Sequence, residues 1–231
     1  MAGGFPACIY LNDYLQTHLP GNLAPRFTAS NPATKRVIMY SHYQALIFDM
    51  DGTLFDTEPL HRQAWLTVFA KYSLSLKEED LIPFNGSAPW QVASKIIQLK
   101  GLRADPHILA ADKKTIVEQL FHSAAIPPLP ALKIVREWYG KKSLALGTGS
   151  ELSTVNTLLT RFNLKHYFDV IVSADRVENH KPAPDTFLLC ASRLNTAPAS
   201  CLVFEDSAFG VMAAKNAGMD VIDVHTLLPE R

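Results

Sequence analysis

The sequence has few cysteines, no long apolar run and no excess of charge of either sign. Its 231 residues include 3 cysteines, an odd number without a CxxC spacing, so no disulfide framework or cysteine motif is predicted. Lys and Arg number 22, as do Asp and Glu, and no block of like charge indicates a nucleic-acid partner. Apolar runs such as 45–48 are far shorter than the roughly 20 residues of a membrane-spanning helix. We therefore expect neither a nucleic-acid nor a membrane partner.

The length and the cysteine positions limit the architecture and the compartment. A chain of 231 residues suits one α/β domain with a modest insertion. Two of the cysteines, Cys190 and Cys201, fall in apolar segments, where a thiol behaves as a small hydrophobic group. Because these are expected to be structural thiols, a reducing cytoplasm is predicted, and we expect a monomer.

Residues 1–38 contain Gly-Gly, several prolines and no sustained helical or strand period, which predicts a poorly ordered extension. A transit peptide is one alternative, although the segment has only Arg26, Lys35 and Arg36 as cations and no apolar region before a cleavage site. A start at Met39 is a second alternative, because the first strand would then begin a few residues from the N-terminus.

The remaining chain alternates short apolar runs with amphipathic stretches. Five runs predict buried strands, at 45–48, 143–146, 168–172, 201–204 and 221–224. Helical patterns follow the second, third and fourth runs, at 151–162, 184–194 and 208–217. Strand followed by helix, repeated, is typical of a parallel sheet with right-handed crossovers. We therefore predict an α/β protein with a Rossmann-like parallel sheet as its core.

One interval interrupts this alternation. Between residues 59 and 126 the sequence has helical stretches and no convincing strand, which predicts an inserted helical cap. The proline-rich run 126–130 then predicts a stiff connector back to the sheet, since proline stops helices. The expected core is therefore made of residues 39–58 and 127–231.

Polar side chains follow three of the predicted strands. Asp49 and Asp51 come directly after the first, Thr148 after the second, and Glu205 with Asp206 after the fourth. Ligands of open parallel sheets bind beyond the carboxyl ends of the strands, so these groups should converge. Carboxylates gathered at one edge repel each other unless a cation compensates, and oxygen ligands without a His or Cys cluster favour Mg²⁺.

These residue types suit phosphoryl transfer. An aspartate such as Asp49 can attack phosphorus and form an aspartyl phosphate, which divides one difficult displacement into two easier steps. Asp51, two residues further on, can protonate the leaving oxygen and later deprotonate water. Lys181, after the third strand, can hold a phosphoryl oxygen and restrain the attacking carboxylate.

In order and context, the segment DMDGT at 49–53, the Thr148 segment, Lys181 and the Glu205-Asp206 pair resemble the four motifs of the haloacid dehalogenase superfamily, in its phosphatase branch. The resemblance implies the superfamily fold with an inserted α-helical cap. It implies Asp49 as nucleophile and Asp51 as general acid/base and backbone metal ligand. It also implies phosphate contacts from Thr148, Gly149 and Lys181, and a Mg²⁺ site that includes Asp49, Asp51, Asp206 and Glu205.

Longer segments, among them DMDGTLFDTEPLHRQAW and HKPAPDTFLLCA, resemble the β-phosphoglucomutase-like subgroup and, within it, the bacterial fructose-1-phosphatase type. The resemblance implies a small sugar phosphate as substrate, with fructose 1-phosphate as the first candidate. In the cap, His61, Asn85 and Lys114 are the candidate substrate contacts. Where the mutase has an arginine that grips a second phosphate, this chain has the stretch 86–89, which ends in Pro89, so hydrolysis is favoured.

Three other functions compete with the phosphatase interpretation. A phosphosugar mutase would need a bisphosphate primer, and a non-catalytic sugar-phosphate sensor would bind without turnover, although both Asp49 and Asp51 are present. The stretch Gly147-Thr148-Gly149 begins a dinucleotide-binding pattern, but its third glycine is replaced by Leu152, which disfavours a nucleotide cofactor.

Overall fold

The structure, a computed structural model, describes residues 40–227. The predicted N-terminal extension of residues 1–38 and the alternative start at Met39 lie outside the described residues.

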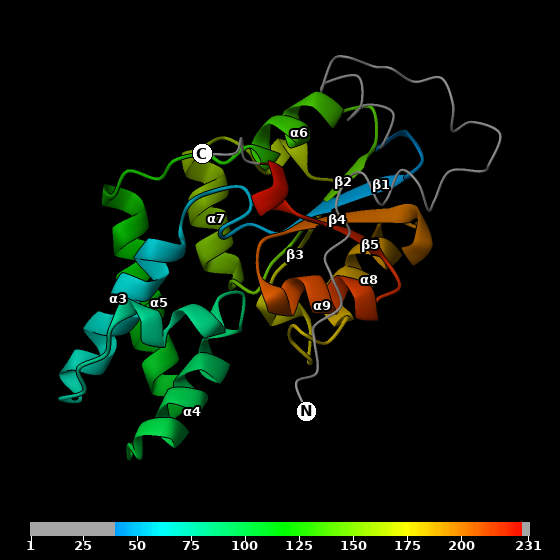
Figure 1. Cartoon of the computed structure of the whole chain (residues 1–231). Coiled ribbons are helices and arrows are strands. Elements are labelled where there is room, and N and C mark those ends of the chain that lie inside the picture. The colour runs from blue at the N-terminus through cyan, green and yellow to red at the C-terminus, as the bar shows by residue number, and fades with distance from the viewer. Residues whose placement is uncertain (1–39, 228–231) are drawn as a thin grey trace. The chain divides into compact units, whose positions relative to one another are not determined.

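A five-stranded sheet lies at the centre of the described chain (Figure 1), and all of its neighbouring strands are parallel. The strand order is β3-β2-β1-β4-β5, which places the first strand in the middle. The strands are β1 (Ala45–Phe48), β2 (Ser143–Gly147), β3 (Val170–Val172), β4 (Cys201–Glu205) and β5 (Asp220–Asp223). The predicted fold class, an α/β protein with a parallel sheet, is confirmed.

Register brings the ends of the three central strands to one level. Phe48 of β1 is opposite Leu146 on one side and Phe204 on the other. Asp49 comes directly after Phe48, and Glu205 directly after Phe204. Since the strands are parallel, the loops that follow them begin at the same edge of the sheet.

Helices cover both faces of the sheet. Alternate strand residues, including Ile47, Ala145 and Val203, pack with α8 (Asp185–Arg193) and α9 (Ala208–Asn216) in one buried cluster. The intervening residues of the strands face the opposite side, because side chains alternate along a strand. In Figure 1, α6 (Ala131–Trp138) and α7 (Leu152–Arg161) lie on that opposite side. Burial on both faces explains why the central strands β1, β2 and β4 are mostly apolar runs. The edge strands β3 and β5 were also predicted to be buried, but they are mostly half-buried because each has a neighbouring strand on one side only.

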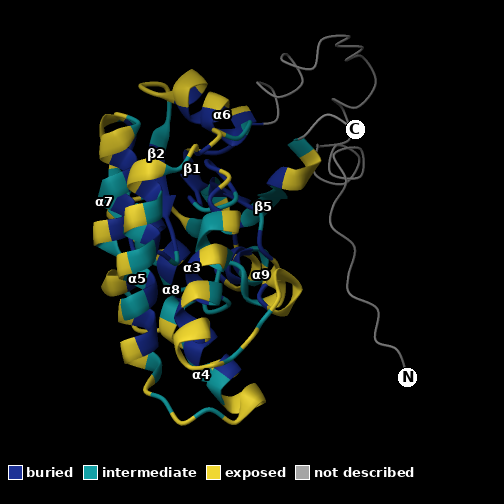
Figure 2. Cartoon of the chain, turned by 90° about the vertical axis from the view of Figure 1, so that its left-hand side faces the viewer, coloured by how far each residue is buried: buried dark blue, intermediate teal, exposed yellow. Residues whose placement is uncertain are grey.

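Between β1 and α6 the chain forms a helical insertion, which we define as Glu58–Ser123. It contains α3 (Glu58–Lys71), α4 (Pro89–Lys100) and α5 (Pro106–Ser123), with short 3₁₀ turns at Glu78–Asp80 and Ile82–Phe84. The insertion has its own hydrophobic cluster, in which Trp65 and Phe69 from α3 pack with side chains of α4 and α5. In Figure 2 the inward faces of these helices are buried and their outward faces exposed.

Two local differences from the sequence analysis have physical causes. Helix α6 was not predicted, because the proline run before it indicated an extended connector; the helix begins at Ala131, directly after Pro130. The connector pairs with the loop after β1, since the Leu129 N–H donates to the Leu54 carbonyl at 2.9 Å. Strand β3 is shorter than predicted because Lys165–Tyr167 forms a 3₁₀ turn before it.

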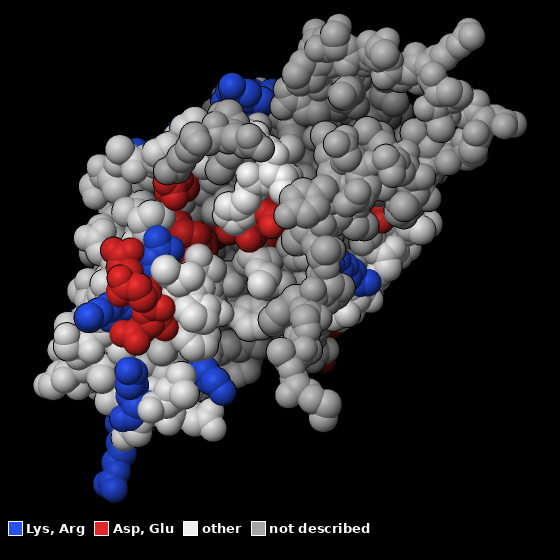
Figure 3. Space-filling model, in the orientation of Figure 1, with Lys and Arg blue, Asp and Glu red and all other residues white. Residues whose placement is uncertain are grey.

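The surface of the described chain carries charged side chains of both signs. On the face shown in Figure 3, acidic and basic side chains of the described residues are interspersed. Within residues 40–227, no helix has both the length and the apolar character that crossing a membrane requires.

We expect Phe69→Ala to destabilise the protein by ~3–5 kcal/mol, the usual loss for truncating a fully buried phenylalanine. Phe69 is fully buried in the cluster of the insertion. The measurement is the free energy of unfolding in urea. Leu99→Ala is the control, because Leu99 on α4 is 60% exposed, and it should change stability by less than about 0.5 kcal/mol. Similar losses in both variants would contradict this account of the cluster.

Candidate active site

The loop after β1 places Asp49 at the edge of the sheet. The Asp49 N–H donates to the carbonyl of Phe204 at 3.0 Å, which continues the β1–β4 ladder by one residue. The chain then turns through Gly52, whose φ of +78° lies in the left-handed region that favours glycine. A side chain at Gly52 would also overlap the Asp206 carboxylate. Glycine at this position therefore allows the turn and leaves room beside Asp206.

Lys181 is a buried cation between two carboxylates. Its Nζ donates to Asp49 Oδ1 at 2.7 Å and to Glu205 Oε1 at 2.6 Å. Burial alone would lower the pKa of Lys181, but Asp49 and Glu205 outweigh it and raise the pKa above its ordinary value. Lys181 is therefore a permanent ammonium group that orients the Asp49 carboxylate.

Glu205 is fully buried and both of its oxygens have protein partners. Oε1 accepts from Lys181, while Oε2 accepts from the Ser207 N–H at 2.7 Å and from Ser207 Oγ at 3.0 Å. Glu205 was predicted to be one of the metal ligands. In the structure, its oxygens are used to hold Lys181 and the start of α9, where Ser207 Oγ also accepts from the Gly210 N–H.

Asp206 and Asp49 are the carboxylates available to a cation. Asp206 Oδ1 accepts from Thr53 Oγ1 at 2.9 Å. Burial, with the charges of Glu205 and Glu58, raises the pKa of Asp206 to about 8. Burial also raises the pKa of Asp49 well above its ordinary value, although Lys181 opposes the effect. Among the described residues, no group of three or more His, Cys, Asp or Glu side chains could hold a metal ion, so backbone oxygens would have to complete any site.

Asp51 accepts hydrogen bonds from three side chains. Its Oδ1 accepts from Thr57 Oγ1 at 2.6 Å and from His61 Nε2 at 2.9 Å, and its Oδ2 accepts from Ser150 Oγ at 2.7 Å. Burial raises its pKa, but the interaction with His61 and the hydrogen bonds from these three donors outweigh burial, so the pKa lies below its ordinary value. Asp51 is therefore held as a carboxylate.

His61 connects Asp51 to a second buried lysine, Lys113. Lys113 Nζ lies 2.6 Å from His61 Nδ1, and His61 Nε2 lies 2.9 Å from Asp51 Oδ1. Because an ammonium group can only donate, Nδ1 must accept and the imidazole proton must be on Nε2. Burial and the charge of Lys113 lower the pKa of His61, which agrees with this neutral tautomer. Burial lowers the pKa of Lys113 to about 8.

Lys114 was predicted to be the substrate-contacting lysine of the cap. The structure places Lys114 in a neighbouring hollow, where its Nζ lies 2.6 Å from Glu151 Oε2. A sequence signal for Lys113 existed. The buried stripe of α5 includes Leu109, Lys113, Val117 and Phe121, each four residues from the next, and Lys114 lies off this stripe.

The loop after β2 completes the core side of the site. The Thr148 N–H donates to the Val172 carbonyl at 3.0 Å, and Thr148 Oγ1 accepts from the Ser150 N–H at 3.0 Å. Gly149 lies against the Gly86 carbonyl, so a side chain at Gly149 would crowd the insertion. Gly86 itself has a φ of +77°, and a side chain there would overlap Ser207. These two glycines allow the insertion to approach the edge of the sheet.

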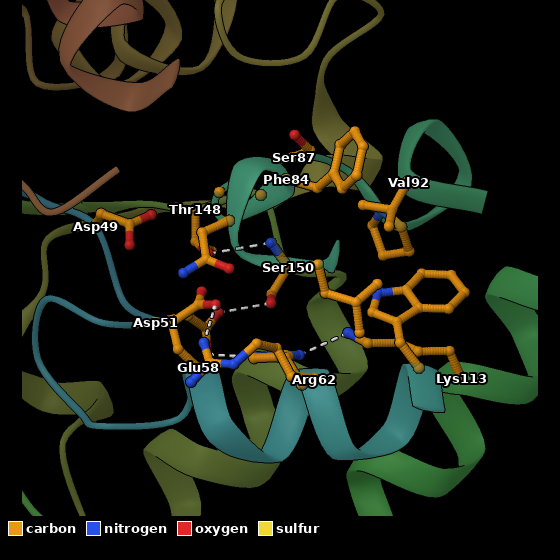
Figure 4. Close-up of a pocket in the computed structure, with 17 residues that line it drawn as sticks. Asp49, Asp51, Glu58, Arg62, Phe84, Ser87, Val92, Lys113, Thr148 and Ser150 are labelled. Carbon is orange, nitrogen blue, oxygen red and sulfur yellow. Dashed lines mark hydrogen bonds and ion pairs between the residues drawn. The ribbon is translucent and has the colours of Figure 1, made fainter. Parts of the chain in front are cut away.

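Beside these side chains lies a pocket with a volume of about 60 Å³, shown in Figure 4. The structure brings together there Asp49, Asp51, Thr148, Gly149, His61 and Asn85, all of them predicted site residues. Four of the predicted site residues do not line it, namely Lys114, Lys181, Glu205 and Asp206. Three further residues of the lining, Glu58, Arg62 and Lys113, were not predicted. In Figure 4, Asp49 and Thr148 lie toward one end, Arg62 lies between, and Lys113 and Val92 lie toward the other end. The pocket thus has a carboxylate-rich end and a mixed polar and apolar end.

Comparison with known proteins defines the class. Residues 46–224 match the family of haloacid dehalogenase-like hydrolases. The chain belongs to this family.

Particular relatives cover most of the described chain. It is 48% identical over 189 residues to fructose-1-phosphate phosphatase YqaB of Escherichia coli (strain K12), covering 82% of this chain and 100% of that protein. It is 35% identical to a phosphorylated carbohydrates phosphatase of Thermotoga maritima, covering 80% of this chain and 87% of the relative. CbbY from Rhodobacter sphaeroides in complex with phosphate superposes with a TM-score of 0.70 at 26% identity, over 78% of this chain and 84% of that structure.

We expect Lys181→Met to destabilise the protein by ~3–5 kcal/mol at pH 8, because it leaves Asp49 and Glu205 as buried carboxylates without their cation. The folded-state pKa of Asp49 is already raised, so protonation at lower pH relieves the unpaired charge. The loss should therefore be smaller at pH 5 than at pH 8. Unfolding in guanidinium at the two pH values measures it, and a larger loss at pH 5 would contradict the ion-pair account.

Proposed function

We propose that this protein is a Mg²⁺-dependent phosphatase that hydrolyses a small sugar phosphate, with fructose 1-phosphate as the first candidate. The observation that supports it most is the 48% identity to the E. coli fructose-1-phosphate phosphatase over that protein's full length. The site adds a chemical reason. Asp49, Asp51, Lys181 and Asp206 lie at one edge of the sheet and supply a nucleophile, an acid/base group, a fixed cation and a carboxylate for a metal ion.

In the first step, Asp49 attacks phosphorus and forms an aspartyl phosphate as the sugar oxygen leaves. Lys181 keeps the Asp49 carboxylate oriented and, with Thr148 and Gly149, supplies donors to phosphoryl oxygens. Asp51 protonates the leaving oxygen. The charge of the arriving phosphoryl group raises the proton affinity of Asp51, and the Lys113–His61 pair offers a hydrogen-bonded route for the proton.

In the second step, Asp51 acts as a base. Its carboxylate form, held by Thr57, His61 and Ser150, is the form that accepts a proton from the attacking water. Water then displaces the Asp49 carboxylate from phosphorus and releases inorganic phosphate.

The residues fit a hard divalent cation. Asp49 is a buried and Asp206 a half-buried carboxylate, both with raised pKa values, which indicates a missing positive charge, and Gly52 leaves space beside Asp206. We propose that these carboxylates and the backbone carbonyl of Asp51 hold Mg²⁺, while Glu205 contributes through Lys181. Bound Mg²⁺ would neutralise charge between the carboxylates and a phosphoryl oxygen.

We propose that residues 59–126 act as a cap on a core of residues 39–58 and 127–231, and that the cap selects the sugar. His61 and Asn85 line the pocket from the insertion. Pro89 also lines the pocket. It ends the stretch where β-phosphoglucomutase has an arginine that grips a second phosphate, and this supports hydrolysis over transfer. We also propose a cytoplasmic monomer, in keeping with the buried thiols of Cys190 and Cys201.

Inorganic phosphate release from a panel of sugar phosphates, with and without Mg²⁺, tests the proposed activity. We expect Mg²⁺-dependent release that falls to background in Asp49→Asn, because the variant lacks the nucleophile. Asp51→Asn should lower the rate by about 10²–10⁴-fold, the usual contribution of general acid–base catalysis. Release only after a sugar bisphosphate primer is added would instead indicate the mutase, and ligand binding without any product would indicate a sensor.

The metal site has a test that is independent of activity. Mg²⁺ at about 100 times its dissociation constant should stabilise the folded protein by ~2.7 kcal/mol, seen as a rise in melting temperature. Asp206→Asn should remove most of this rise. Asp80→Asn, at an exposed position in the insertion, serves as the control and should keep it. An undiminished rise in Asp206→Asn would place the cation elsewhere.

A further inference from the structure

The hollow that contains Lys114 is larger than the pocket of Figure 4. Its volume is about 340 Å³, compared with about 60 Å³ for the pocket. Ligand sites usually have volumes of ~300–1,000 Å³, so the pocket by itself encloses only part of a bound sugar phosphate. A substrate with a second bulky group would have to place that group outside the pocket.

The pocket and the hollow adjoin each other at three places in the chain. Pro89 lines both cavities. Ser150 lines the pocket, and Glu151, the next residue, lines the hollow. In the same way, Lys113 lines the pocket and Lys114 lines the hollow. The hollow is therefore the space into which a substrate held at the carboxylate-rich end of the pocket would extend.

The hollow carries more negative than positive charge. Among the described residues that line it, Glu151 and Asp175 are acidic, and Lys114 is the one lysine or arginine. Lys114 Nζ lies 2.6 Å from Glu151 Oε2, and this hydrogen bond raises the pKa of Lys114. Burial lowers the pKa of His180, so this lining residue adds no positive charge at pH 8. The charge of Lys114 is thus already paired with a carboxylate of the protein.

The N-terminus of α7 faces a carboxylate as well. Helix N-termini attract anions such as phosphate, because their first N–H groups lack partners within the helix. Here the N–H of Leu152, the first residue of α7, donates to Asp175 Oδ2 at 2.7 Å. Asp175 therefore takes a place that a phosphoryl oxygen could otherwise take. Both groups beside the hollow that suit an anion, the lysine and the helix N-terminus, already have carboxylate partners.

We propose that Glu151 is a specificity-determining residue that rejects a second phosphoryl group on the substrate, and that it acts by pairing with Lys114. A phosphate monoester carries about −1.5 to −2 charge at pH 7. In the hollow this charge would meet an excess of negative charge and a lysine that is already paired. The proposal rests on the proposed phosphatase function and deepens it by naming the substrate class as sugar monophosphates.

The test compares fructose 1-phosphate with fructose 1,6-bisphosphate at pH 8. We expect the unaltered protein to favour the monophosphate by about tenfold or more in kcat/KM. Glu151→Gln should raise kcat/KM for the bisphosphate by about tenfold, equal to ~1.4 kcal/mol, and leave that for the monophosphate within about twofold. A larger gain is not expected, because the side chains of Lys114 and Glu151 are 36% and 32% exposed and solvent screens them.

Glu151→Ala also frees Lys114 and should give the same gain. Because the expected result is a gain in activity, unfolding of a variant cannot produce it. An unchanged value for the bisphosphate in both variants, or equal gains on the two substrates, would overturn the proposal.

The part assigned to Lys114 has its own comparison. In a Glu151→Gln background, Lys114→Gln should return kcat/KM for the bisphosphate to that of the unaltered protein, and Lys114→Gln alone should give no gain. A full gain in the double variant would contradict the pairing, because Glu151 would then act without Lys114.

Asp112→Asn is the matched control. Asp112 lies on α5, as Lys114 does, and its Oδ2 lies 3.1 Å from Lys71 Nζ, but it does not line the hollow. The variant removes a carboxylate from another lysine pair and should change kcat/KM for either substrate by less than about twofold. A gain on the bisphosphate equal to that of Glu151→Gln would indicate an effect of net charge alone and would overturn the assignment to Glu151.

The same assays separate this proposal from the proposed function. If the unaltered protein releases phosphate from neither substrate, the phosphatase function fails and this proposal fails with it. If it hydrolyses the monophosphate and the bisphosphate equally well, the function stands and the proposal alone is overturned.

Discussion

The ammonium group of Lys181, buried between Asp49 and Glu205, is the interaction on which the site depends. Two carboxylates at this depth would repel each other, and the cation between them offsets this repulsion, although burial still holds the pKa of Asp49 above its ordinary value. Glu205 in turn binds Ser207, which begins α9. Asp49, the cation and a core helix are therefore joined in one hydrogen-bonded unit, and the position of Asp49 is fixed by the same contacts that hold the sheet edge together.

The insertion and the core meet at this edge through unusually small spacings. The backbone of Gly86 lies against the side chain of Ser207, and the backbone of Gly149 lies against the backbone of Gly86. No side chain separates the insertion from the core at these two places. Two polar networks then reach the pocket from the insertion. Lys113 acts on Asp51 through His61, and Arg62 lies beside Glu58. In the proposed mechanism the reacting groups therefore come mainly from the strand ends, and the groups that face the substrate come mainly from the helices.

A structural feature could be predicted from the sequence where it depends on a local pattern, and could not where it depends on contacts across the fold. The strands and the residues after them were predictable, because apolar runs and strand ends are local patterns, and the structure gathers Asp49, Asp51 and Thr148 at one pocket. Glu58 and Arg62 were not predictable, since on α3 nothing local separates a pocket-facing polar residue from a solvated one. The contacts of Glu205 with Lys181 and Ser207 depend on distances across the sheet edge, which a local sequence pattern does not predict.

Lys113 has a consequence for how this protein can change. It occupies a place in the buried stripe of α5 where Leu109, Val117 and Phe121 show that an apolar side chain packs well. A charged group there weakens the insertion relative to leucine or methionine, so under the proposed mechanism the position trades stability for activity. A directed-evolution experiment that selects only for thermal tolerance would be expected to replace this lysine early. The fold would then be kept, and the proton route that the proposed mechanism assigns to Lys113 would be lost.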